Sequence, residues 1–132
     1  MRFLLASIIT VLATMTFTSC DQKIQTQDSP QFTEVYKDGI ESRRTLKIEI
    51  EGMMCEVGCA SKIKKELLEQ DAVSSVIIDF VKERETDFAI VEFDPKGNTI
   101  EYIYGVVNAI ADGKLYNVKS VETTYYKENH PE

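Results

Sequence analysis

The sequence predicts an α+β domain of the ferredoxin-like type over residues 45–123, with the element order βαββαβ. In this fold a four-stranded antiparallel sheet carries two helices on one of its faces. Three observations predict it: one segment in which apolar and charged residues alternate, two segments with apolar residues at helical spacing, and three further short runs rich in β-branched and aromatic residues.

The first half of the domain combines a strand, a helix and a second strand. Alternation of apolar and charged residues over 45–51 is typical of a half-buried strand, and Gly52 ends it. Apolar residues three and four apart over 60–70, set among lysines and glutamates, predict an amphipathic helix. The β-rich run 73–80 predicts the second strand, and the charged run 81–85 predicts a solvated turn.

The second half repeats this order after a third strand over 88–93. Apolar residues over 100–111 recur at i, i+3, i+4, i+7, i+10 and i+11, the pattern of a helix with one apolar face. Asn98 is placed to cap this helix and Gly113 to end it. The run 115–121 predicts the fourth strand, which completes the sheet.

The N-terminal residues 1–19 have the features of a signal peptide: a basic residue followed by a short apolar stretch. Residues 17–20, Phe-Thr-Ser-Cys, resemble a bacterial lipobox, and this resemblance implies that Cys20 is acylated after export and holds the protein on a bacterial membrane. Simple cleavage with a free Cys20, or an uncleaved anchor, are the alternatives. Residues 20–44 are polar and predict a flexible tether, with room for a short strand near 32–36, and residues 124–132 predict a polar tail.

Composition excludes several classes of function. The net charge of −7 argues against nucleic acid as a partner, because phosphate binding needs clustered Lys and Arg. A single histidine, His130, cannot supply a His-based catalytic triad or a His-rich zinc site. Three cysteines are too few and too close together for a disulfide-stapled scaffold.

Cys55 and Cys59 lie where the first strand leads into the first helix. The helix N-terminus favours negative charge and is expected to lower the thiol pKa, which populates the thiolate form that binds metal. Two thiolates with almost no imidazole favour a soft ion, Cu(I) first, with Zn(II), Hg(II) and Cd(II) as alternatives. Gly58 is expected to let the loop bend until both sulfurs reach one ion.

Residues 52–59, Gly-Met-Met-Cys-Glu-Val-Gly-Cys, resemble the Gly-Met-x-Cys-x-x-Cys loop of heavy-metal-associated domains, found in copper chaperones, metal-pumping ATPases and the periplasmic mercury-binding protein. The resemblance implies metal binding and transfer, an inward-packed Met53, and a Lys114 that offsets the charge of the site. The spacing Cys-x-x-x-Cys is one residue longer than in that family. Met54 replaces a small or polar residue and is a candidate weak third ligand.

The sequence therefore predicts an exported, lipid-tethered metal-binding protein rather than an enzyme, working beside a metal transporter or another metallochaperone. A thiol–disulfide redox protein, and an interaction domain with a degenerate metal site, are the alternatives. The cysteines can also be a disulfide or buried inert thiols, Met53 a core residue, and Lys114 a solvated turn residue. Five tyrosines are expected to cover the core or the surface rather than to form a site: Tyr102, Tyr104, Tyr116, Tyr125 and Tyr126.

Overall fold

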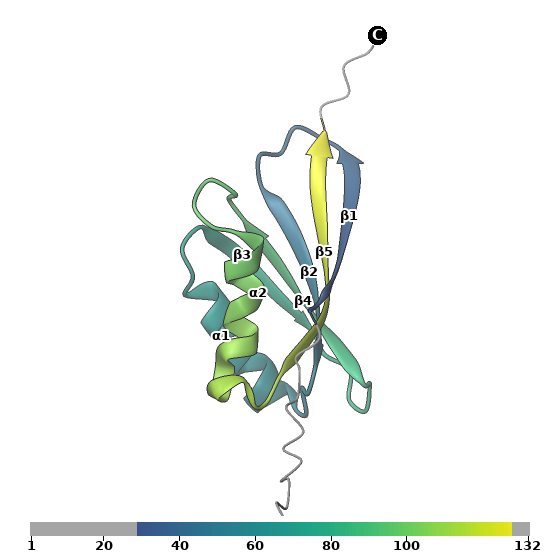
Figure 1. Cartoon of the computed structure of the whole chain (residues 1–132), viewed down its shortest axis with the longest axis vertical. Helices are drawn as coiled ribbons and strands as arrows, with labels where there is room; N and C mark the ends of the chain where they lie inside the picture. The colour runs from purple at the N-terminus through teal and green to yellow at the C-terminus, as the bar shows by residue number, and fades with distance from the viewer. Residues whose placement is uncertain (1–28, 128–132) are drawn as a thin grey trace, which may run out of the picture.

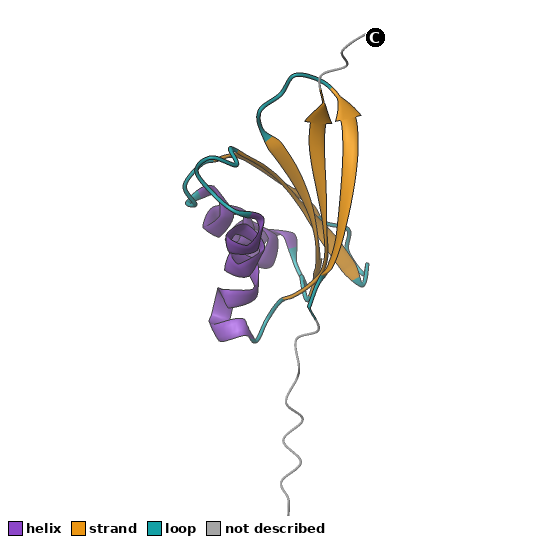
Figure 2. Cartoon of the chain, turned by 45° about the horizontal axis from the view of Figure 1, so that its top comes forward, coloured by secondary structure: helices purple, strands orange, loops and turns teal. Residues whose placement is uncertain are grey.

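The structure, a computed structural model, describes residues 29–127, in which two helices cover one face of a five-stranded sheet (Figures 1 and 2). The predicted signal peptide, Cys20 and His130 lie outside the described residues. Within residues 29–127 no helix combines the length and apolar character needed to cross a membrane. In chain order the elements are β1 (Gln31–Asp38), β2 (Arg44–Glu51), the π-helical turn η1 (Glu56–Ala60), α1 (Ser61–Leu68), β3 (Val73–Asp79), β4 (Thr86–Phe93), α2 (Ile100–Ala109), the 3-10 turn η2 (Ile110–Gly113) and β5 (Asn117–Lys127).

The prediction of a four-stranded antiparallel, ferredoxin-like sheet is wrong. The sheet has five strands in the order β1-β5-β2-β4-β3, and it is mixed, because β1 pairs in parallel with β5 while the other neighbours are antiparallel. The added strand covers residues 31–38 of the predicted tether, where the sequence left room for a short strand near 32–36. Residues 31–38 pair along the outer edge of β5, from Gln31 opposite Ser120 to Asp38 opposite Lys127.

The fifth strand forms because β5 is longer than the sequence pattern predicted. β5 continues to Lys127 instead of ending at residue 121, and this extension offers a long unpaired edge. Aromatic contacts then hold β1 in place: Tyr36 stacks on Tyr125 with ring centroids 5.3 Å apart, and Phe32 meets Tyr104 of α2 at 5.6 Å. Such contacts are worth a fraction of a kcal/mol to about 1.5 kcal/mol each, which favours pairing of an otherwise exposed strand.

The core lies between the helices and the covered face of the sheet. Alternate residues of β2 point into it, as the apolar–polar alternation predicted, and the apolar faces of both helices cover them. The buried apolar residues are Leu46, Ile48, Ile50, Met53, Ala60, Ile63, Leu67, Val76, Ala89, Val91, Phe93, Ile103, Val107, Ile110, Tyr116, Val118 and Val121.

Helix α2 begins at Ile100, where the apolar pattern begins, but its cap lies one residue after the predicted cap, Asn98. Its cap is Thr99, whose Oγ1 accepts a hydrogen bond from the backbone N–H of Tyr102 at 3.2 Å. Asn98, the predicted cap, instead donates its amide to the carbonyl oxygen of Asp71 at 2.7 Å. Asn98 therefore joins the loop before α2 to the loop after α1 and does not cap the helix.

Gly52 brings the loop after β2 against the segment before β5. Its φ is +102°, and a Cβ at this position would lie 2.2 Å from the carbonyl oxygen of Leu115. Both the backbone conformation and the close approach therefore require glycine. Because β2 ends where the antiparallel β5 begins, with Glu51 opposite Asn117, residues 53–59 lie beside the start of β5.

Candidate metal centre

The structure brings the two predicted metal-binding cysteines together. The Sγ atoms of Cys55 and Cys59 are 3.9 Å apart. Both residues are free thiols; Cys55 is exposed, while Cys59 is half-buried and packs against the hydrophobic core. One sulfur is therefore held by the core and the other faces solvent, so an ion arriving from outside can reach both.

A widened helical turn accommodates the spacing of these cysteines. η1 is a π-helical turn, in which the backbone N–H of Ala60 donates to the carbonyl oxygen of Cys55, five residues earlier, at 3.2 Å. Cys55 itself is extended (φ −156°, ψ 150°) and stands immediately before the turn. A π-turn holds one more residue than an α-turn, so the three residues between the cysteines fit in a single turn. Turns of this kind are frequent at functional sites.

Gly58 makes room for the sulfur of Cys55. A Cβ placed on Gly58 would lie 2.9 Å from Cys55 Sγ, closer than carbon and sulfur approach without displacement. Because Sγ is the end of a short exposed side chain, the clash can be relieved by moving the sulfur rather than the backbone. Gly58 therefore sets the position of one of the two sulfur atoms.

We expect Gly58→Ala to weaken Cu(I) binding while leaving the thermal unfolding midpoint close to that of the parent. The added methyl group displaces Cys55 Sγ and changes the separation of the two sulfurs. Gly105→Ala is the matched control, since a Cβ on Gly105 in α2 meets nothing within 4 Å. Equal Cu(I) affinity for Gly58→Ala, Gly105→Ala and the parent, in competition with a chelator, would show that this sulfur position is unimportant.

The pKa of the Cys59 thiol is lowered by hydrogen bonds that converge on its sulfur. The backbone N–H of Met54 has the largest effect, followed by the hydroxyl of Tyr116, and the backbone N–H and thiol of Cys55 add to them. Partial burial opposes this shift. The helix terminus was expected to lower the thiol pKa, but the stabilising N–H groups come instead from the loop that precedes η1.

Tyr116 is a site residue that the sequence analysis missed. Its side chain is 4% exposed, in the core beside Cys59. Burial and, after it, the neighbouring Cys59 thiol raise the pKa of Tyr116, so its hydroxyl keeps its proton beside the sulfur. The sheet topology points to Tyr116. β5 is the antiparallel partner of β2, so it begins beside the loop that follows β2, and Tyr116 is the residue just before β5.

We expect Tyr116→Phe to raise the pKa of Cys59, because the phenyl ring keeps the packing but removes a hydrogen bond to the thiolate. The pH midpoint of Cys59 alkylation in a Cys55→Ser background should therefore move upward. Cu(I) binding should also be lost at a higher pH as acid is added, since protons compete with the metal for the thiolate. An unchanged alkylation profile would contradict the role of the hydroxyl.

Of the other predicted site residues, Met53 is buried, whereas Met54 and Lys114 are exposed. Met53 is 7% exposed and belongs to the core, beneath the loop. Met54 is 84% exposed beside Cys55, where its thioether is open to solvent. Lys114 is exposed in the turn before β5, and within residues 29–127 its side chain forms no hydrogen bond or ion pair. The structure thus supplies no contact that ties Lys114 to the cysteines.

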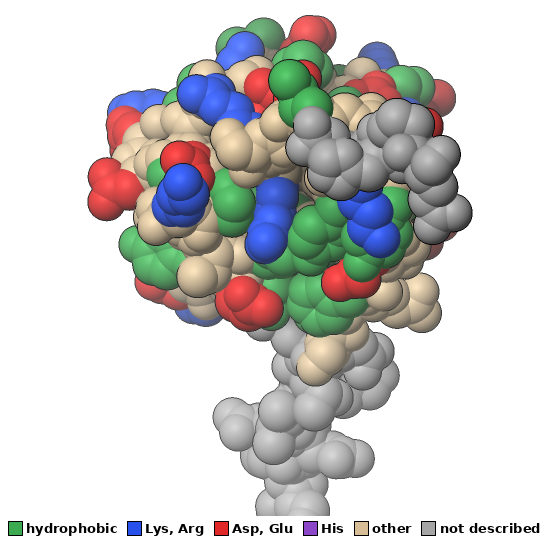
Figure 3. All heavy atoms as spheres, turned by 90° about the horizontal axis from the view of Figure 1, so that it is seen from above, with side chains coloured by type: hydrophobic (Ala, Val, Ile, Leu, Met, Phe, Trp, Pro, Cys, Tyr) green, Lys and Arg blue, Asp and Glu red, His purple; other side chains and the backbone are tan. Residues whose placement is uncertain are grey.

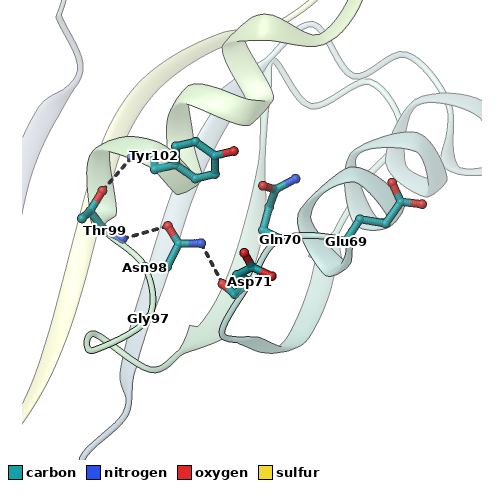
Figure 4. A pocket seen from close by; sticks show the side chains of 7 residues that line it. All are labelled: Glu69, Gln70, Asp71, Gly97, Asn98, Thr99 and Tyr102. Carbon is teal, nitrogen blue, oxygen red and sulfur yellow. Dashed lines mark hydrogen bonds between the residues drawn. The ribbon is translucent and has the colours of Figure 1, made fainter.

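In the described part of the chain there is no group of three or more His, Cys, Asp and Glu side chains placed to share a metal. A separate hollow lies at the far end of α1 from the cysteines, between the end of α1 and the start of α2 (Figure 4). The Asn98 amide bridges its two walls by donating to Asp71, and Tyr102 borders it. This hollow contains no thiol and is not part of the cysteine pair.

No protein-family model and no curated protein matches this sequence. A fold alone does not define a function, because one fold carries many unrelated sites. The functional argument therefore starts from the chemistry of Cys55, Cys59 and their surroundings.

Proposed function

We propose that this protein binds one soft metal ion, Cu(I) in the first place, through the thiolates of Cys55 and Cys59, and passes it on by ligand exchange. The observation that carries the proposal is the 3.9 Å separation of two free sulfurs at an exposed turn. The lowered pKa of Cys59 supports it, because the thiolate is the form that binds metal.

The sulfur separation is compatible with a two-thiolate site. With metal–sulfur bonds of about 2.3 Å, sulfurs 3.9 Å apart make an angle of about 115° at the ion. A linear S–metal–S arrangement needs the sulfurs about 0.7 Å further apart. Because Cys55 is exposed, rotation of its side chain can supply this movement while Cys59 stays in place.

The ligand set favours Cu(I) over the alternatives. Thiolates select soft ions, and two of them satisfy Cu(I). Zn(II) prefers four ligands in a tetrahedron, and this loop supplies two strong ones, so Zn(II) is expected to bind more weakly. Hg(II) and Cd(II) share the preference for sulfur and are alternative ions. Met54 beside the pair can add a weak thioether contact.

The exposed position of Cys55 favours a carrier over an enzyme or a permanent structural site. An incoming thiolate from a partner can bond to the ion before either cysteine releases it, so the ion is never left without ligands. A metal transporter or another metallochaperone is the proposed partner. The proposed lipid on Cys20, in an exported protein, would keep this exchange at a bacterial membrane.

Cys20→Ala is expected to release the protein from the membrane fraction or to block its processing, because the variant has no thiol to acylate. Fractionation of cells that express the parent and the variant measures this directly. Cys55→Ser serves as the control, since it removes a thiol without touching the lipobox-like residues. Membrane association of Cys20→Ala equal to that of the parent would rule out the lipid anchor.

Native mass spectrometry of the reduced mature protein tests the proposed function. After exposure to Cu(I), one added copper ion per chain is expected, with less occupancy after Zn(II) and none in metal-free buffer. Absence of bound copper under reducing conditions would contradict the proposal and favour the interaction-domain alternative.

The thiol–disulfide alternative makes a different prediction for the same two residues. A redox protein would exchange its Cys55–Cys59 disulfide with other proteins at a rate and potential suited to catalysis. In the metal-carrier proposal, oxidation to a disulfide only blocks copper binding until a reductant is added. A disulfide-exchange assay with the metal-free protein separates these roles.

A further inference from the structure

The first described residue and the cysteine pair lie at the same end of the domain. β1 and β5 are parallel, so both begin at the end of the sheet where β2 finishes (the lower end in Figure 1). Ser29 borders the first residues of β5. Gln31 lies opposite Ser120, about 13 Å along the strand from Tyr116, the neighbour of Cys59.

Pairing of β1 leaves only a short connection to Cys20. The tether predicted over residues 20–44 is reduced, because residues 31–38 are held in the sheet. From Cys20 to Ser29 the chain has nine residues, which span at most about 30 Å when fully extended. A flexible chain of that length has an r.m.s. span of about 15–18 Å.

We infer that the chain presents the Cys55–Cys59 pair toward the membrane that holds Cys20, so that the metal partner is a protein embedded in or lying on that membrane. This inference rests on the proposed function and on the proposed lipid anchor. Both the tether attachment and the metal loop are at one end of the sheet, while the β1–β2 turn and the end of β5 are at the other.

The length of the sheet makes the reverse orientation unfavourable. β1 alone is eight residues long, about 26 Å, and the turn that follows it extends further. Turning the cysteine end away from the bilayer would lift Ser29 by about this length, which needs a nearly fully extended tether. The orientation with the cysteines near the surface needs no such extension, so chain entropy favours it.

The side chains at the two ends of the domain are consistent with this orientation. The metal loop and the residue before Tyr116 expose the apolar side chains of Met54, Val57 and Leu115, which suit contact with another protein. At the opposite end, seen in Figure 3, charged side chains of both signs surround a hydrophobic patch. At that end Lys127 Nζ lies 4.0 Å from the centre of the Tyr36 ring.

Energy transfer to acceptor lipids measures the orientation directly. The acylated full mature chain is labelled at a single new cysteine, Leu115→Cys at the metal end or Ile40→Cys at the far end, in a Cys55→Ser, Cys59→Ser background. Leu115 is 56% exposed and Ile40 is 83% exposed, so both sites accept a fluorophore. In vesicles that carry an acceptor headgroup, transfer is expected to be higher from position 115 than from position 40.

Insertion of about 20 Gly and Ser residues between Gln27 and Asp28 is the matched control, because a long tether lets the domain turn over. The insertion should remove most of the difference between the two positions. With the natural tether, energy transfer that is equal from both positions, or higher from position 40, would overturn the inference. The inference would also fail if the mature chain did not float with vesicles. Because both labelled chains lack the cysteine pair, these outcomes do not depend on copper binding, which mass spectrometry tests separately.

Discussion

Replacing either Cys55 or Cys59 by serine is expected to abolish stoichiometric Cu(I) binding. A serine hydroxyl stays protonated at neutral pH and is a hard ligand, so each variant retains one strong donor for a soft ion. The loss of affinity should exceed the roughly 10–100-fold typical of losing a group that only orients a metal ligand. Gly58→Ala changes the position of a sulfur, and Tyr116→Phe changes the charge state of a thiol. Each of these variants should lose about 10–100-fold in Cu(I) affinity.

A competition titration against a Cu(I) chelator measures this series under reducing conditions. Met54→Ala is the control at the loop, because the exposed thioether of Met54 is at most a weak ligand. It should lose far less affinity than either serine variant. If the parent and both serine variants share one affinity, copper is bound elsewhere in the chain.

Ile103→Ala is expected to destabilise the domain by about 2–5 kcal/mol, the range for deleting a large buried aliphatic side chain. Ile103 is completely buried on the inner face of α2. A change of this size is a large fraction of the total stability of a small domain. Denaturant unfolding of the metal-free protein, with constant m-value, measures the effect.

Tyr102→Ala is the control for Ile103→Ala, because it removes a large side chain from the same helix at a position that is 60% exposed. Its effect should be small compared with that of Ile103→Ala. Similar unfolding midpoints for Ile103→Ala, Tyr102→Ala and the parent would mean that this face of α2 does not contribute to the core.

Local periodicity predicted most elements of the domain but not its sheet. Apolar alternation located β2, and helical spacing located α2, since both patterns report which face is buried. For β1 the sequence left room only for a short strand near 32–36, because nearly all residues of β1 are exposed and it therefore carries no burial pattern. Its pairing depends on the length of β5 and on contacts such as Tyr36 with Tyr125, which are distant in sequence.

In the site, too, features set by neighbouring residues were predicted, whereas a feature set by strand pairing was not. The pairing of Cys55 with Cys59 follows from their spacing within one turn, and Gly58 between them was expected to permit it. The π-turn could not be read from composition, because it is the backbone's adjustment to one additional residue. Tyr116 was missed because its role depends on the start of β5 lying beside the end of β2.

X-ray absorption spectroscopy of the Cu(I)-loaded protein tests the central claim most directly, because it counts the atoms bonded to copper. The account predicts two sulfur neighbours, with at most a weaker third sulfur from Met54. Loss of the sulfur shell in the Cys55→Ser, Cys59→Ser double variant would identify its source. A copper shell in the parent made only of nitrogen and oxygen would contradict the proposal that Cys55 and Cys59 hold the ion.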